Sequence, residues 1–170
     1  MKTRTVRVNL QIEHFGIRYR LVIDRKEKCQ LKKHCDKCHP AAVMPKRATD
    51  GAAGFDLTAV SVKYGDGGKV FYDTGIAVEI PAGYVGLLFQ RSSVYKTGLS
   101  LCNAVGVCDA DFRGSISFIF RIGYGASQPY KVGERIGQIV FVPIPEVELV
   151  ESDELSETAR GAGGYGSTGK

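Results

Sequence analysis

The glycine-rich stretch that ends the chain carries the residue types needed to hold a phosphorylated aromatic ligand. Residues 160–170 read Arg-Gly-Ala-Gly-Gly-Tyr-Gly-Ser-Thr-Gly-Lys. Glycine lets a backbone approach a ligand closely, and Ser167 and Thr168 offer hydroxyl donors. Arg160 adds positive charge for phosphate oxygens, and Tyr165 adds one flat ring. A terminus rich in Gly and Ser is also typical of a solvated tail, so the rest of the chain has to decide between these interpretations.

Four other segments carry polar groups of the same kind. Asp56 follows a glycine turn in residues 53–57, and residues 133–138, Gly-Glu-Arg-Ile-Gly-Gln, place the amide of Gln138 on a predicted strand. Residues 91–93 read Arg-Ser-Ser and open the one helix candidate, and helix N-termini with free amides bind phosphate. Residues 103–114 read Asn-Ala-Val-Gly-Val-Cys-Asp-Ala-Asp-Phe-Arg-Gly, which places an amide, two acids and an aromatic ring around a tight turn. Singly, each segment also suits an ordinary turn or surface role.

These segments are joined by short apolar runs with Gly, Pro or Asp between them, a spacing that favours a β-sandwich or barrel. The predicted strands are 55–60, 69–72, 76–80, 84–89, 99–101, 116–121, 136–142 and 147–150. One helix is predicted at 92–97, with a serine cap and with Gly98 at its end. A chain that is nearly all β lacks the setting of a Rossmann or P-loop motif.

The N-terminal part has a different composition. Residues 5–12 and 17–23 alternate apolar and polar side chains, which predicts a hairpin with its turn at 13–16. Residues 24–39 are polar and predict a loop or short helix. Residues 1–47 hold 13 Lys and Arg against 4 Asp and Glu. This basic segment suits either a nucleic-acid or acidic protein partner, or simply a solvated surface.

Three of the cysteines and two of the histidines cluster within this basic part. They are Cys29, His34, Cys35, Cys38 and His39. The group has ligand types that hold zinc, while reduced thiols in a basic loop are the alternative. Cys102 and Cys108 lie in apolar runs and are predicted to be small core residues.

Length and composition set outer limits on the function. A chain of 170 residues with 44% hydrophobic and 24% charged residues is large enough for one domain with a full core. Its apolar runs are shorter than a membrane span, and the N-terminus does not resemble a signal peptide. We therefore expect no membrane association and a cytoplasmic location, in a cell or in the host cell of a virus.

Together, the five segments resemble the trimeric dUTPase family over residues 40–170, and they occur in the family's order. The resemblance implies an all-β, jelly-roll-like barrel or sandwich with one short helix and a flexible glycine-rich C-terminal arm. It implies a homotrimer whose active sites lie between subunits. The implied reaction is the Mg²⁺-dependent hydrolysis of dUTP to dUMP and diphosphate. The expected division is an N-terminal extension at 1–39, a barrel at 40–151 and an arm at 152–170.

The resemblance also implies roles for individual positions. Asp109 matches the general base that activates the attacking water, and Asp56 matches an acid that supports the metal's water shell. The positions that match phosphate-binding residues are Arg91, Ser92, Ser93 and Gln138 in the body, and Arg160, Gly166, Ser167 and Thr168 in the arm. The positions that match the uridine site are Asn103, Gly106, Val107, Cys108, Phe112, Ser117 and Tyr165.

Several positions depart from the family pattern. Phe112 replaces a tyrosine and Tyr165 a phenylalanine, and both keep the ring. Ser93 stands where glycine is common. The alternatives left open are a dCTP deaminase, a bifunctional deaminase–dUTPase, and a regulatory protein of the same fold that acts through its N-terminal insertion.

Overall fold

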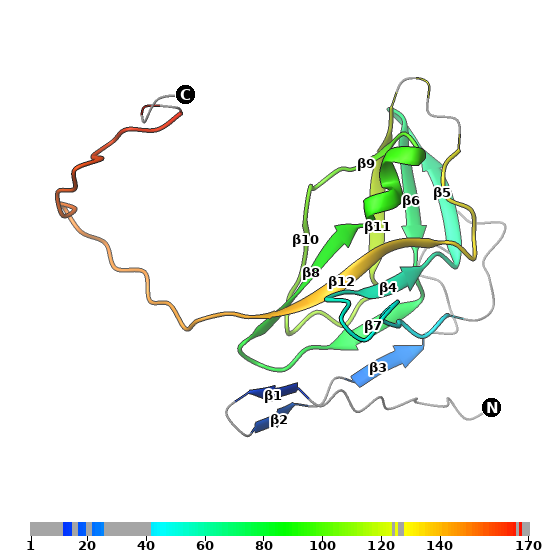
Figure 1. Cartoon of the computed structure of the whole chain (residues 1–170), viewed down its shortest axis with the longest axis horizontal. Coiled ribbons are helices and arrows are strands. Elements are labelled where there is room, and N and C mark those ends of the chain that lie inside the picture. Colours follow the sequence, from blue (N-terminus) through cyan, green and yellow to red (C-terminus); the bar gives the residue numbers. More distant parts are fainter. Residues whose placement is uncertain are drawn as a thin grey trace.

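The computed structural model describes residues 12–14, 17–19, 22–25, 42–123, 125, 128–165 and 167, and only the backbone of the first three segments. The body is built from β-strands, and one short helix, η2, lies at one end of it (Figure 1). Within these described residues no helix is both long and apolar enough to cross a bilayer.

Two four-stranded antiparallel sheets contribute the side chains of one shared core. One sheet has the strand order β10-β8-β12-β4 and the other has the order β5-β6-β11-β9. The first contains β4 (Phe55–Thr58), β8 (Tyr84–Gln90), β10 (Gly106–Cys108) and β12 (Arg135–Pro143). The second contains β5 (Ser61–Gly65), β6 (Lys69–Asp73), β9 (Leu99–Leu101) and β11 (Ser117–Ile122). The predicted all-β sandwich is confirmed.

Two smaller pairs involve the N-terminal strands. β1 (Ile12–His14) pairs with β2 (Ile17–Tyr19), which confirms the predicted hairpin but extends its first strand into the expected turn. β3 (Val22–Arg25) pairs with β7 (Ile76–Glu79) of the body. Assigning residues 22 and 23 to the hairpin was therefore wrong, because this part of the chain completes a different strand pair.

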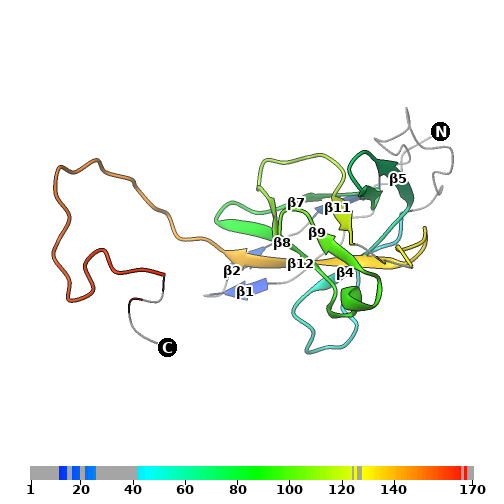
Figure 2. The ribbon, with the colours of Figure 1, turned by 90° about the horizontal axis from the view of Figure 1, so that it is seen from above.

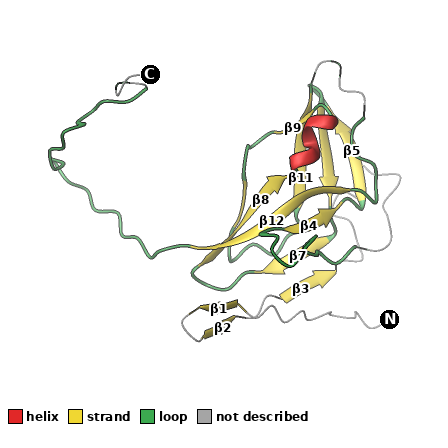
Figure 3. Ribbon diagram, viewed as in Figure 1, coloured by secondary structure: helices red, strands yellow, loops and turns green. Residues whose placement is uncertain are grey.

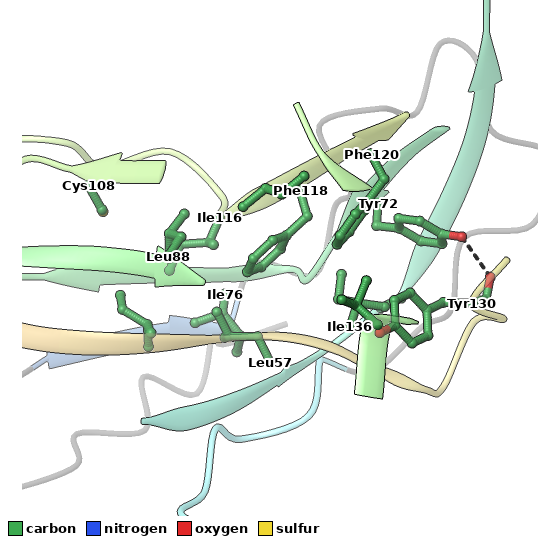
Figure 4. Packing of buried hydrophobic residues seen from close by; sticks show 14 of the residues in the cluster. Leu57, Tyr72, Ile76, Leu88, Cys108, Ile116, Phe118, Phe120, Tyr130 and Ile136 are labelled. Carbon is green, nitrogen blue, oxygen red and sulfur yellow. Dashed lines mark hydrogen bonds between the residues drawn. The ribbon is translucent and has the colours of Figure 1, made fainter. Parts of the chain in front are cut away.

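Alternating side chains explain how the sheets enclose a core. In β11, Phe118 and Phe120 are buried while Ser117, Ile119 and Arg121 face outward, which is the period-two pattern of a strand with one buried face. The two phenylalanine rings stack with their centroids 6.1 Å apart. Figure 4 shows them beside Tyr72, whose hydroxyl donates a hydrogen bond of 2.9 Å to the Tyr130 carbonyl.

Gly137 allows β12 to pass directly over this aromatic cluster. A Cβ at this position would lie 2.3 Å from Cε1 of Phe118. Contacts that short do not occur between packed carbon atoms, so an alanine here would push the ring or the strand aside. The glycine thus fixes the path of the strand that carries Gln138.

One predicted strand was wrong, two strands were missed, and the helix differs from its prediction. The segment at 147–150 is exposed chain with no strand partner, while β5 and β10 were not predicted. The helix is a 3₁₀ helix, η2 (Ser92–Lys96), and its N-cap is Arg91 without a side-chain cap. The serine cap was therefore wrong, since extended backbone continues from β8 through Arg91 and Ser92 is already helical.

After β12 the chain leaves the body as an extended segment. Figures 1 and 2 show residues 144–165 running away from the sheets in both views, and Figure 3 shows them as loop. Large apolar side chains along this segment are half to fully exposed: Ile144, Val147, Leu149, Val150, Leu155 and Tyr165.

Candidate active site and family assignment

The hairpin around β10 and the turn that follows it line one pocket of ≈380 Å³. The expected base, Asp109, shares this pocket with six residues expected at the uridine site: Asn103, Gly106, Val107, Cys108, Phe112 and Ser117. β10 is held in place because it pairs along its length with β8. At Gly106 a Cβ would approach the Cβ of Leu88 to 3.0 Å, so glycine permits this close pairing.

A compact turn presents Asp109 at the edge of this pocket. Asp109 is exposed, whereas the preceding Cys108 is buried in the core. The turn closes on itself because the Phe112 amide donates to the Asp109 carbonyl at 3.1 Å. The Arg113 guanidinium donates to the Ala110 carbonyl at 2.6 Å. The Asp109 carboxylate therefore lies on a turn that is held by hydrogen bonds, and it is accessible to water.

The ring of Phe112 lies over the end of the same turn. A Cβ on Gly114 would lie 2.3 Å from the ring's Cζ, so only glycine leaves room for the ring in this position. Phe112 is 44% exposed and lines the pocket. Its ring therefore gives the pocket an apolar surface, and the expected contact with the sugar remains a prediction.

Cys108 contributes an apolar side chain to the pocket. Burial raises the pKa of its thiol, and the neighbouring Asp109 carboxylate raises it further. The thiol therefore stays protonated near neutral pH. The prediction that Cys108 is a core residue is confirmed, but the same prediction for Cys102 was wrong, because Cys102 is exposed.

A second group of polar residues gathers where β4, β8 and β12 meet the start of η2. One oxygen of Asp56 lies 3.3 Å from Nε of Arg91, and the other lies 2.8 Å from Nη1 of Arg135. Arg91 in turn donates to the Ser93 hydroxyl at 3.5 Å. Asp56 is mostly buried, with 14% of its side chain exposed. It thus holds two arginines beside the hydroxyls of η2.

Gln138 belongs to this second group. It lies opposite Asp56 in the β12–β4 pair, and its amide donates to the Gln90 carbonyl at 3.5 Å. Gly54 makes room for it, since a Cβ there would lie 2.3 Å from the amide oxygen of Gln138. The structure thus brings Asp56, Arg91, Ser93 and Gln138 together, as a phosphate site needs.

Within one chain the two groups remain separate. Ser93 and Arg135 line a larger groove of ≈1130 Å³, and none of the described residues that line it also lines the pocket of Asp109. Among the described residues of the arm, none forms a hydrogen bond or ion pair with either group. Arg160 instead donates from Nε to the Gly163 carbonyl at 2.8 Å, within the arm.

Some sequence-based assignments lie outside the described residues. Gly166, Thr168 and the whole Cys/His group at 29–39 fall there, so the zinc interpretation remains a prediction. In the part of the chain that is described, no three His, Cys, Asp or Glu side chains are grouped to hold a metal ion.

Sequence reasoning missed two residues near these groups. Arg135 forms an ion pair with Asp56, which lies 79 positions earlier in the sequence, and no local sequence pattern predicts such a pair. Ser115 lines the pocket of Asp109. Its position directly after the turn was the only available signal.

Comparison with known proteins decides between the remaining functions. The sequence profile of the dUTPase family matches residues 41–169. The chain belongs to the dUTPase family. One relative, the deoxyuridine 5'-triphosphate nucleotidohydrolase of Corynebacterium efficiens, is 42% identical over 135 residues, which cover 77% of this chain and 74% of that protein. The nucleotidohydrolase of Wolinella succinogenes is 43% identical over 137 residues, covering 79% of this chain and 91% of that protein.

The fold of the chain is also found in solved dUTPase structures. The dUTPase of Staphylococcus bacteriophage 80alpha with dUPNHPP matches with a TM-score of 0.69 at 27% identity, covering 88% of this chain and 98% of that chain. The chain is thus an enzyme that hydrolyses dUTP to dUMP and diphosphate. The predicted reaction and jelly-roll-like fold are confirmed, and the deaminase and regulator alternatives are not favoured.

Proposed function

We propose that the enzyme completes each active site from several copies of the chain, in a homotrimer. The supporting observation is that Ser93, one of the proposed phosphate-binding residues, lines a groove that shares none of its described lining residues with the nucleoside pocket of the same chain. A second support is the extended segment 144–165 with its exposed aliphatic side chains. Exposed apolar side chains that are grouped on one part of a protein often mark a protein–protein interface.

In the proposed reaction Asp109 is the general base. Its carboxylate accepts a proton from a water molecule while the water oxygen forms a bond to the α-phosphorus. The bond from the α-phosphorus to the bridging oxygen breaks, and diphosphate leaves with the electron pair. Support comes from the position of Asp109, which is exposed on a braced turn at the edge of the nucleoside pocket.

The pocket around β10 is proposed to select deoxyuridine. The Asn103 amide and the backbone of 106–108 would bond the polar edge of uracil, and the tightness of the hairpin would leave no space for a thymine methyl. Phe112 would press against the sugar where a 2′-hydroxyl would otherwise lie, and Ser117 would line the same pocket. A substrate analogue that clashes with such a site, or that leaves a hydrogen-bonding group of the site unpaired, loses more affinity than one additional contact would provide.

Four residues are proposed to bind the phosphates and to neutralise charge on the bridging oxygen. They are Arg91, Ser92, Ser93 and Gln138. Asp56 would orient Arg91 through their ion pair at 3.3 Å. The arm of another subunit would then close the site. Its proposed contacts are Arg160, Gly166, Ser167 and Thr168 on the γ-phosphate, and Tyr165 on the uracil ring.

The donor set fits a magnesium ion that arrives on the triphosphate. Both oxygens of Asp56 already face arginines, so this carboxylate supports the site without ligating the ion. Mg²⁺ commonly binds through substrate phosphates and water, where it offsets phosphate charge. The dUTPase of phage phi11 of S. aureus, in a mutant form, coordinates a structural Mg(II) ion.

A substrate panel tests this proposal. We expect diphosphate release from dUTP, and rates at least ~10²-fold lower from dTTP, dCTP and UTP, because each analogue adds or removes a group at a fitted contact. EDTA should suppress the reaction, and added MgCl₂ should restore it. Equal rates with dUTP and UTP would rule out the role given to Phe112, and release of deoxyuridine products from dCTP would restore the deaminase alternative.

The assembly has its own test. Light scattering coupled to gel filtration should give a mass three times that of the 18.5 kDa chain. Hydrophobic burial of residues 144–155 between copies should favour this state over the monomer. A monomeric mass with full activity would contradict a shared active site.

A further inference from the structure

A buried turn from the other sheet holds the chain directly after the turn of Asp109. Asp73 is the last residue of β6 and is completely buried, as is Thr74. One oxygen of the Asp73 carboxylate accepts a hydrogen bond from the Gly75 amide at 2.9 Å and another from the Ser115 hydroxyl. Hydrogen bonds to a carboxylate are stronger than those between neutral groups, so this is a firm attachment point for Ser115.

The next residue, Ile116, is fixed to the same turn through its backbone. Its carbonyl accepts from the Thr74 amide at 3.1 Å and from the Thr74 hydroxyl at 2.8 Å. Its amide donates to the Ile76 carbonyl at 2.8 Å. Figure 4 places Ile116 in the core beside Leu88. Residues 115 and 116 are therefore anchored both by a side chain and by the backbone.

The anchored residue is also part of the nucleoside pocket. Ser115 is only 6% exposed, yet it lines the same cavity as Asp109 and Phe112. The turn at 109–114 is closed by its own hydrogen bonds, and the ion pair between Arg113 and Glu79, at 3.9 Å, links it to β7. Its two ends also join it to the body. One end is Cys108, held by the β10–β8 pair, and the other end is Ser115.

We propose that Asp73 and Ser115 are positioning residues for catalysis. Their hydrogen bond fixes the second end of the turn and thereby fixes where the Asp109 carboxylate stands relative to the attacking water. The inference rests on the proposed role of Asp109 as the base. Neither residue touches the reacting atoms in this proposal, so each acts through the placement of the turn. An error of about 1 Å in such placement can cost ~10²-fold in rate.

Steady-state kinetics of Ser115→Ala provide the first test. We expect kcat for dUTP to fall ~10-fold while KM stays within ~2-fold, because only the alignment of the base is disturbed. Asp73→Ala should behave alike. Asp73→Asn keeps an oxygen acceptor for Ser115 and should restore most of the loss. Tyr72→Phe is the matched control, since it removes a different buried hydrogen bond and should keep kcat even where it lowers Tm.

A double variant separates positioning from general destabilisation. If Ser115 acts through Asp109, adding Ser115→Ala to Asp109→Asn should lower kcat by less than ~2-fold further, because groups that act as a unit are not additive. The inference is overturned if Ser115→Ala keeps wild-type kcat, or if its loss is undiminished in the Asp109→Asn background. If Asp109→Asn alone remains active, the proposed base is wrong instead, and the two failures are thus distinguishable.

Discussion

Replacing Asp109 with asparagine should lower kcat for dUTP by ~10²–10⁴-fold, the range that a positioned general base contributes. Asparagine keeps the shape of the side chain but cannot take up the proton of the attacking water. The turn should survive, because its hydrogen bonds run through the Asp109 carbonyl and through Arg113 and not through the carboxylate. Binding of the non-hydrolysable analogue dUpNHpp should therefore change little, and calorimetry can measure this directly.

Asp111 supplies the matched control for this experiment. It lies two positions along the same turn, is also exposed, and does not line the pocket that contains Asp109. Asp111→Asn makes the same chemical change and should leave kcat near wild type. If Asp109→Asn kept more than about a tenth of wild-type turnover, its loss would fall short of what a general base provides, and a different residue would have to activate the water.

The strands that bury one face were predictable because their alternation is strong and local. β11 and β12 were found nearly whole, since burial of alternate apolar residues dictates a strand whatever lies beside it. β5 was missed because it is short and half exposed. β10 was missed because its three residues read as part of a turn. At 147–150 the error is the opposite one, because a strand was predicted where none forms. A strand forms only when a partner strand pairs with it, and none of the described residues pairs with 147–150.

Cys102 shows that alternation could have been applied more strictly. Leu99 and Leu101 of β9 are buried and Ser100 is exposed, so the next position points outward. Counting Cys102 as core relied on its apolar neighbours instead of on its place in the period. The periodicity was the better guide.

The sequence predicted which segments contribute to the candidate site, but it did not predict how their side chains are arranged in space. The role expected of Asp56, support of the metal's water shell, remains a prediction, and the structure adds its ion pairs with Arg91 and Arg135, which no local pattern indicated. The Asp73–Ser115 bond spans 42 positions. Such contacts depend on how sheets pack, and a single sequence carries no signal for them. Local motifs therefore predicted a set of candidate residues, and the fold determines which other residues hold them in place.

Deleting residues 160–170 should lower kcat by about 10²-fold or more while leaving the unfolding temperature nearly unchanged. Losing one donor from a preorganised anion site already costs ~10²–10³-fold, and this deletion removes several proposed γ-phosphate donors. The hydrogen bonds of the described residues of this segment stay within it, as in the Arg160–Gly163 bond, or reach Thr158 just before it. Most of them are exposed, so the folded body loses little when they are absent.

Ordering the arm over the substrate should also be visible without turnover. Fixing each backbone residue costs roughly 1–2 kcal/mol, which only contacts to phosphate and base can offset. Trypsin should therefore cleave after Arg160 rapidly in the free enzyme and slowly with dUpNHpp and Mg²⁺. Protection should be weaker with dUDP, which lacks the γ-phosphate. Arg160→Ala should reproduce much of the loss in kcat, whereas Glu157→Ala, on the exposed chain just before the glycine-rich segment, should not. Full activity of the truncated enzyme, with no difference in cleavage between the free and bound states, would show that the arm does not close the site.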